Sequence, residues 1–294
     1  LPFKGEAINI GADGRRITPG SDCKPDSYRI DLYGGSTMWG MGAPDQETIP
    51  AYIQAALHEQ FGDRICVTNQ AELGFVSTQE LIRLMKQFQH NEAPHLAVFY
   101  DGVNDTIAAY NSGEAGVHRN LGPFVDTFQG KSTTNPLVDW LMHTYLVTFV
   151  RGLIGVPNPA PVIQVDYRQL GDDVASVYLS NVKMGNTLAD AYNIQTIFIW
   201  QPIMVVGNKV LTDEEKIMEE VVPDNLLTTY QEAWAQVEAS VSDEQRLYSV
   251  ADVFDGIEEP LYIDHHHLAP QGNQIVAQRI VEIITPTITA ALSN

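Results

Sequence analysis

The sequence is poor in basic residues and has no long apolar run. It contains 17 Lys and Arg against 37 Asp and Glu, so the formal net charge of the 294 residues is −20. A chain with this charge repels nucleic-acid phosphates and anionic lipid headgroups, and we expect neither as a partner. No stretch approaches the roughly 18 consecutive apolar residues that span a bilayer, so we expect no membrane insertion of this chain.

Cysteine is also scarce. Cys23 and Cys66 are too few for a disulfide framework or a zinc site. They are compatible with one bridge in an oxidising compartment and equally with two free thiols. The chain begins at Leu1 without a basic-then-apolar leader, so a leader or anchor removed upstream is compatible with the sequence and the compartment stays open.

The acidic residues include three short runs. These are Asp213-Glu214-Glu215, Glu219-Glu220 and Glu258-Glu259. Because runs of like charge are usually solvated, we expect them on the surface.

Short apolar runs alternate with helical patterns after an irregular, Gly- and Pro-rich lead-in at residues 1–27. The alternation predicts βαβ crossovers, and hence one α/β domain over residues 1–294 with helices on both faces of a parallel sheet. The expected strands are residues 28–33, 64–68, 95–100, 194–200 and 246–250. The expected helices are residues 48–61, 78–90, 173–192, 224–240 and 270–292.

Residues 106–171 do not fit this alternation. The segment is too long for an ordinary strand-to-helix connection, and it contains an apolar, helical pattern at residues 137–153. A long insertion of this kind indicates a lid over a binding site, and a packing appendage or dimer surface is an equal alternative. The oligomeric state is open.

A serine follows the first expected strand, in Gly34-Gly35-Ser36. The carboxyl ends of parallel strands form the edge at which α/β proteins bind ligands, which makes Ser36 a candidate nucleophile. A phosphate-binding loop would need a lysine before the hydroxyl residue, and the Gly-x-Ser-x-Gly elbow would need glycine in place of Met38. An ordinary polar turn is the remaining alternative.

Two further loops follow the next strands at the same edge. Asn104, in Gly102-Val103-Asn104-Asp105, can donate a side-chain N–H to an oxygen that becomes negative during acyl transfer. Gly74 can offer a backbone N–H to the same oxygen. Both sequences are also ordinary turn chemistry.

Asp264 and His267 stand three residues apart near the end of the chain. One turn of helix-like backbone places them on one side, where the carboxylate can orient the imidazole as a base. His265 and His266 complete three consecutive histidines, but adjacent side chains point in different directions and no cluster with i, i+4 histidine spacing accompanies them. We therefore expect these two to be spectators, and we expect neither a metal nor an organic cofactor.

These motifs, in this order over residues 34–267, are similar to the four blocks of the SGNH (GDSL) hydrolase family. Gly35 stands where the family often has Asp. The resemblance implies a flavodoxin-like, three-layer α/β/α sandwich around a five-stranded parallel sheet. It also implies Ser36 as nucleophile, His267 as base and Asp264 as its orienter. The implied oxyanion hole consists of the Ser36 and Gly74 N–H groups and the Asn104 side chain.

The activity that the resemblance implies is hydrolysis of carboxylic esters through an acyl-enzyme. We expect short acyl groups, acetyl above all, on a carbohydrate or small alcohol. Two alternatives stay open, an O-acyltransferase acting on a saccharide and a catalytically silent carbohydrate-binding or scaffold domain. The lead-in Pro2-Phe3-x-Gly5-Glu6-x-x-Asn9 resembles the start of relatives that look like extracytoplasmic bacterial proteins, so that location is an expectation too.

Overall fold

The computed structural model describes residues 2–118, 120, 121, 124, 125 and 165–293. The strands are β1 (Phe3–Lys4), β2 (Asn9–Ile10), β3 (Tyr28–Gly34), β4 (Ile65–Asn69), β5 (Leu96–Asp101), β6 (Gln195–Trp200) and β7 (Leu247–Ser249). The α-helices are α1 (Ser36–Trp39), α2 (Ile49–Phe61), α3 (Ser77–His90), α4 (Val103–Ser112), α8 (Tyr167–Tyr192), α9 (Asp213–Glu220), α10 (Asp224–Glu238) and α11 (Pro270–Leu292). Two short 3₁₀ helices, η1 (Asp45–Glu47) and η2 (Gly62–Arg64), flank α2.

Five strands form one parallel sheet in the order β4-β3-β5-β6-β7. All six residues of β5 are buried, as expected for a strand that is covered on both faces. The predicted five-stranded parallel α/β architecture is confirmed, and each of the five strands lies at its predicted place in the chain. Because β3 and β5 are neighbours, the loops after them, which carry Ser36 and Asn104, leave the sheet side by side.

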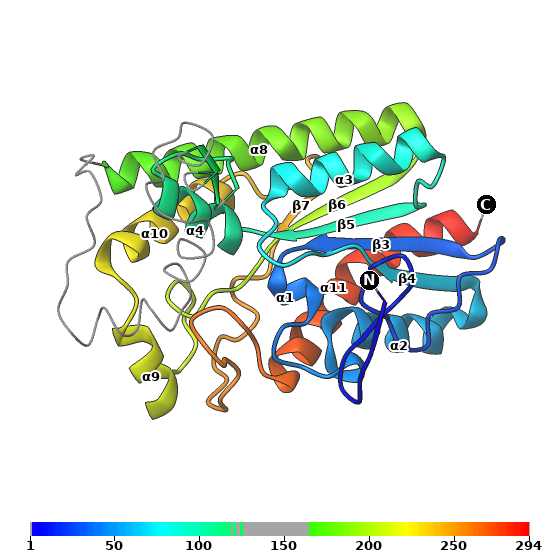
Figure 1. Cartoon of the computed structure of the whole chain (residues 1–294), viewed down its shortest axis with the longest axis horizontal. Helices are drawn as coiled ribbons and strands as arrows, with labels where there is room; N and C mark the ends of the chain where they lie inside the picture. The colour runs from blue at the N-terminus through cyan, green and yellow to red at the C-terminus, as the bar shows by residue number, and fades with distance from the viewer. Residues whose placement is uncertain (1, 119, 122–123, 126–164, 294) are drawn as a thin grey trace, which may run out of the picture.

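Helices cover both faces of the sheet and complete three layers (Figure 1). The helices α2 and α11 pack on one face, around Ile53, Leu57, Ile280 and Ile284. The helices α3 and α8 cover the other face, and α10 packs against α8 with Ala233 and Val237 in the same core cluster. Burial of apolar surface in these two clusters is the main favourable term that holds the layers together.

Several helix boundaries differ from the sequence prediction. The helix α8 begins at Tyr167, earlier than expected, because the Asp166 side chain caps it by accepting from the N–H groups of Arg168 and Gln169. The short helices α1, α4 and α9 were not predicted, since they are too short to show a clear apolar period.

The lead-in is more ordered than its composition indicates. The strands β1 and β2 pair in an antiparallel sheet. The Arg16 guanidinium is buried, pairs with Asp45 at 2.8 Å, and donates to the carbonyls of Gly40 and Ala43 at 2.6 Å each. The lead-in, which is irregular apart from these two short strands, therefore supports the segment that follows α1.

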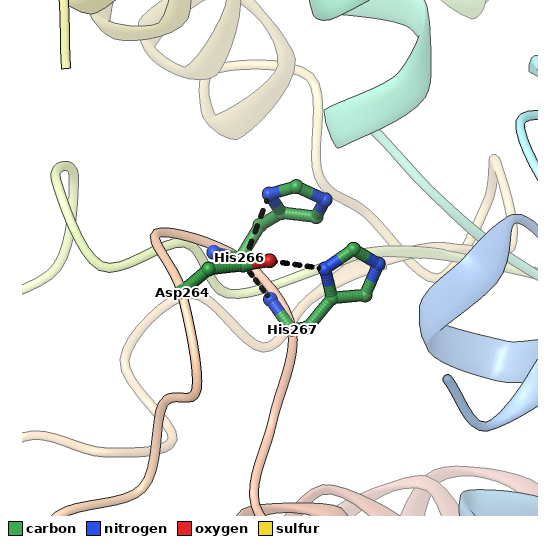
Figure 2. A group of neighbouring side chains, drawn as sticks. All are labelled: Asp264, His266 and His267. Carbon is green, nitrogen blue, oxygen red and sulfur yellow. Dashed lines mark hydrogen bonds and ion pairs between the residues drawn. The ribbon is translucent and has the colours of Figure 1, made fainter. Parts of the chain in front are cut away.

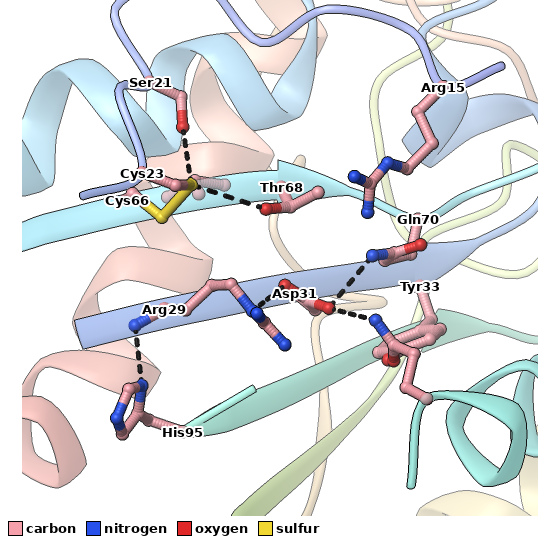
Figure 3. A network of polar contacts seen from close by, with 12 residues as sticks. Arg15, Ser21, Cys23, Arg29, Asp31, Tyr33, Cys66, Thr68, Gln70 and His95 are labelled. Carbon is pink, nitrogen blue, oxygen red and sulfur yellow. Dashed lines mark hydrogen bonds and ion pairs between the residues drawn. A yellow bond between two sulfur atoms is a disulfide. The ribbon is translucent and has the colours of Figure 1, made fainter. Parts of the chain in front are cut away.

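A disulfide joins Cys23 in the lead-in to Cys66 in β4, which settles the alternative that the sequence left open (Figure 3). On the neighbouring strand β3, the buried carboxylate of Asp31 accepts from the side-chain amides of Gln70 and Gln87, at 3.0 and 2.6 Å. The disulfide thus attaches the lead-in to β4, the edge strand of the sheet. The hydrogen bonds of Asp31 attach β3 to α3 and to the loop after β4.

Most of the predicted insertion at residues 106–171, including the apolar pattern at 137–153, lies outside the described residues. Its beginning belongs to α4 and its end to α8. Whether the remainder acts as a lid or as a packing surface stays a prediction.

Among the described helices, α11 alone is long and apolar enough by length and composition to cross a membrane. Its apolar residues Val276, Ile280, Ile284 and Ile288 are buried in the core beside α2, as in the core helix of many globular domains. The expectation of no membrane insertion stays a prediction.

Candidate active site

Ser36 is the first residue of α1, directly after β3. The turn between the two elements requires small residues: a β-carbon on Gly34 would lie 2.6 Å from Met38 Cβ and 2.9 Å from the Tyr100 carbonyl oxygen. The chain can therefore turn sharply at the sheet edge, and the Ser36 hydroxyl emerges there, as predicted.

Ser36, His267 and Asp264 form one chain of hydrogen bonds. Ser36 Oγ lies 2.7 Å from His267 Nε2, and His267 Nδ1 lies 2.6 Å from Asp264 Oδ2. Figure 2 shows the second of these contacts. Ser36 and His267 are more than nine-tenths buried. The structure thus brings together the three residues that the sequence predicted as serine, base and orienter.

A closed loop holds Asp264 and His267 in this geometry. Ile263 donates its N–H to the His267 carbonyl at 2.9 Å, and the Asp264 carboxylate accepts the N–H groups of His266 and His267 at 2.9 and 2.8 Å. The loop is closed at its base by the pairing of Tyr262 with Leu268. The two side chains consequently face the same side, as their spacing predicted.

The electrostatics of this loop favour an ionised Asp264. Burial raises the pKa of the Asp264 carboxyl, but the hydrogen bond from His267, the neighbouring His266 and the two backbone N–H groups outweigh it and hold the pKa well below its usual range. A carboxylate that stays ionised fixes the Nδ1–H tautomer of His267 and leaves Nε2 to accept a proton.

Asn104 lies beside Gly35 at the start of α4. Its Nδ2 donates to the Phe75 carbonyl at 2.8 Å, which leaves the second N–H of the amide for another acceptor. Gly74 lies in the same loop as Phe75 with a φ of +75°, a left-handed conformation that favours glycine. The predicted oxyanion donors therefore come from loops that meet next to Ser36, and their role stays a prediction.

The side chain of His266 lies beside that of His267, so the expectation that adjacent histidine side chains point in different directions was wrong for this pair, whereas the expectation that His266 is a spectator stays a prediction. Its ring lies 4.0 Å from that of His267, centroid to centroid, and its Nδ1 lies 3.3 Å from Asp264 Oδ1. The tight loop folds adjacent side chains together. Burial, with His267 close by, lowers the pKa of His266 to about 3, so the ring is neutral.

A buried ion pair that the sequence interpretation missed supports the loop. Glu215 belongs to an acidic run that we expected on the surface, but its side chain is fully buried. It accepts from Lys209 Nζ at 2.6 Å and from the N–H groups of Leu261 and Tyr262 at 2.9 and 3.2 Å. The one signal in the sequence is the capping-box spacing of Thr212 and Glu215.

Three more carboxyl groups are buried near Asn104, those of Asp101 at the end of β5, Asp105 in α4 and Glu80 in α3. Asp105 accepts from the Ser77 hydroxyl at 2.6 Å and so links the start of α4 to α3. Burial raises the pKa of Asp105 to about 6 and those of Glu80 and Asp101 well above their usual range. Their residue types gave no hint of burial, since isolated acidic residues are mostly exposed.

Comparison with known proteins identifies the fold. No protein-family model and no curated protein matches the chain. Among solved structures, the lipase Lip_vut3 from a goat rumen metagenome is similar over 87% of this chain and 97% of its own, with a TM-score of 0.51 and 11% identity. This likeness shows that the two proteins share a fold.

Two other structures are similar at lower scores. A catalytic mutant of the acetylxylan esterase Axe2 from Geobacillus stearothermophilus has a TM-score of 0.49 and 13% identity, covering 89% of this chain and 96% of its own. A member of the lipolytic G-D-S-L family from Veillonella parvula has a TM-score of 0.45 and 12% identity, covering 87% and 98%.

Proposed function

We propose that this protein is a serine hydrolase that cleaves carboxylic esters through an acyl-enzyme. The observation that carries the proposal is the hydrogen-bonded chain of Ser36, His267 and Asp264, with contacts of 2.7 and 2.6 Å. A serine hydroxyl is a weak nucleophile until an adjacent base removes its proton, and a carboxylate-oriented imidazole is such a base.

In the proposed reaction, His267 Nε2 takes the Ser36 proton as Oγ attacks the ester carbonyl. The resulting oxyanion accepts hydrogen bonds from the Ser36 and Gly74 N–H groups and from the free N–H of Asn104. Protonated His267 then gives its proton to the leaving alcohol. Water, activated by the same base, attacks the acyl-enzyme, releases the acid and restores Ser36.

A short acyl group suits the surroundings of Ser36. Met41 and Ile263 adjoin the site, since their N–H groups donate to the carbonyls of Ser36 and His267. Both side chains are nearly half exposed, so they offer an acyl chain only partial burial. A small acyl group such as acetyl needs little apolar enclosure. A longer acyl chain gains about 0.8 kcal/mol of binding free energy per methylene only if the protein buries that methylene.

The test is hydrolysis of p-nitrophenyl acetate, butyrate and octanoate by the wild type and by Ser36→Ala. We expect turnover that falls with chain length in the wild type and none above background in the variant. Ser180→Ala, which removes an exposed hydroxyl of α8, is the matched control and keeps wild-type rates. Equal rates in the wild type and Ser36→Ala, or no turnover of any ester, would overturn the proposal.

A further inference from the structure

Asp264, His266 and His267 each place one metal-binding atom in the same small region. The carboxylate oxygen of Asp264 and the two ring nitrogens lie within 4.8 Å of one another (Figure 2). The Nδ1 atoms of His266 and His267 face opposite oxygens of the same carboxylate, at 3.3 and 2.6 Å. Two consecutive histidines therefore flank one carboxylate.

His266 Nδ1 is the atom that the ester hydrolysis leaves unexplained. The His266 side chain is nine-tenths buried, and its Nδ1 makes no hydrogen bond. A buried polar atom without a partner is costly, so it is a natural acceptor for a ligand that can reach it. The exposed part of the Asp264 side chain, 44% of its surface, gives access to the cluster from solvent.

The donor set selects the kind of cation. Two imidazole nitrogens and one carboxylate favour zinc and similar transition metals, whereas magnesium and calcium prefer oxygen ligands alone. Tetrahedral zinc with bonds of about 2.0 Å holds its ligand atoms roughly 3.3 Å apart. His266 Nδ1 already lies at this separation from Asp264 Oδ1, and His267 Nδ1 needs to move away from Asp264 Oδ2 by less than ~1 Å. The three ligand atoms lie within 4.8 Å of one another, so the widest pair needs to close by at most roughly 1.5 Å.

We propose that Asp264, His266 and His267 form an inhibitory binding site for Zn²⁺ or a chemically similar divalent transition-metal ion. His266 Nδ1, His267 Nδ1 and the Asp264 carboxylate, whose two oxygens each face one of the rings, supply three protein ligands, and water completes the coordination. Three protein ligands and an open fourth position are a common zinc arrangement.

The inhibition follows from the tautomer of His267. In the metal-free site, Nδ1 carries the ring proton and Nε2 accepts from Ser36. A metal binds Nδ1 only through its in-plane lone pair, so the proton must leave Nδ1, and the single proton of the neutral ring then resides on Nε2. Nε2–H can only donate to Ser36 Oγ, so His267 no longer removes the serine proton. This consequence rests on the proposed ester hydrolysis, whereas metal binding does not.

The test measures Zn²⁺ binding by isothermal titration calorimetry on tag-free protein, with the wild type, His266→Gln and His265→Gln compared. We expect one site in the wild type, roughly tenfold or greater weakening in His266→Gln, and no change in His265→Gln, because His265 is not among the three ligands. His267→Gln, which removes a second ligand, is the further variant and weakens binding likewise. Equal affinity in the wild type and both ligand variants, or no binding, overturns the proposal.

A second measurement separates this proposal from that of the function. Ester hydrolysis is titrated with Zn²⁺, and each rate is expressed relative to the same variant without metal. We expect the inhibition constant to rise at least about tenfold in His266→Gln and to stay unchanged in His265→Gln. Zinc binding without any esterase activity would contradict the proposed function alone. Undiminished hydrolysis by zinc-saturated enzyme would overturn the inhibitory role.

Discussion

The Asn104 amide occupies the space that a side chain on Gly35 would need. A β-carbon added to Gly35 would lie 1.8 Å from Asn104 Nδ2 and 3.0 Å from its Cγ. The absence of a side chain before Ser36 is therefore what lets the amide approach the nucleophile.

We expect Gly35→Ala to displace the Asn104 amide and to lower kcat by about 10²–10³, as Asn104→Ala does, because either change removes an oxyanion donor. The kcat of the double variant is little lower than that of the less active single variant, since both changes remove the same hydrogen bond from the Asn104 amide to the oxyanion. The measurement is kcat for p-nitrophenyl acetate, with Asn208→Ala, an exposed amide, as the control. Wild-type kcat in Asn104→Ala would remove this residue from the site.

Removing the Glu215 carboxylate should destabilise the loop that carries Asp264 and His267. Glu215→Ala leaves Lys209 charged without its partner in a buried position and three N–H groups, those of Thr212, Leu261 and Tyr262, without this acceptor, which costs about 3–5 kcal/mol of the free energy of unfolding. Urea denaturation measures this loss. Glu214→Ala, an exposed neighbour in the same helix, is the matched control, and an equal effect of both changes would contradict the proposed support.

Asp105 should make the protein less stable as pH rises through mild acid. The folded state raises the pKa of Asp105 from 3.8 to about 6, so between these values it binds more protons than the unfolded state. The contribution is therefore fully present below pH ~4 and is lost as pH approaches ~6. The urea midpoint of Asp105→Asn, compared with the wild type at pH 4, 5, 6 and 7, measures it. We expect the fall to be shallower in the variant, in which Glu80 and Asp101 still titrate, and parallel profiles would contradict the prediction.

Loss of the Cys23–Cys66 bridge should lower stability and leave the chemistry intact. The bridge closes a loop of 43 residues, for which chain entropy gives a stabilisation of about 4 kcal/mol. Cys23→Ser with Cys66→Ser therefore lowers the urea midpoint, and dithiothreitol acts likewise on the wild type. The kcat of the folded variant stays near the wild-type value, because neither cysteine belongs to the candidate site. A midpoint that does not move would contradict the expected stabilisation.

The sequence predicted the architecture because the architecture follows from local patterns. Runs such as residues 95–100 are apolar throughout, as in strands covered on both faces, and the intervening helical periods require parallel crossovers. The same alternation placed Ser36 and Asn104 at one edge of the sheet. The spacing of Asp264 and His267 placed both side chains on one side of their loop.

Only the tertiary structure decided which of these parts meet. Ser36 and His267 stand 231 residues apart, and no local period states that their side chains are 2.7 Å from each other. The burial of Glu215, the contact of His266 with Asp264 and the pairing of Cys23 with Cys66 likewise depend on how distant loops pack. The hydrophobic period of a segment shows which face of that helix or strand is apolar. Which distant residues come into contact depends on how all the helices and strands pack together.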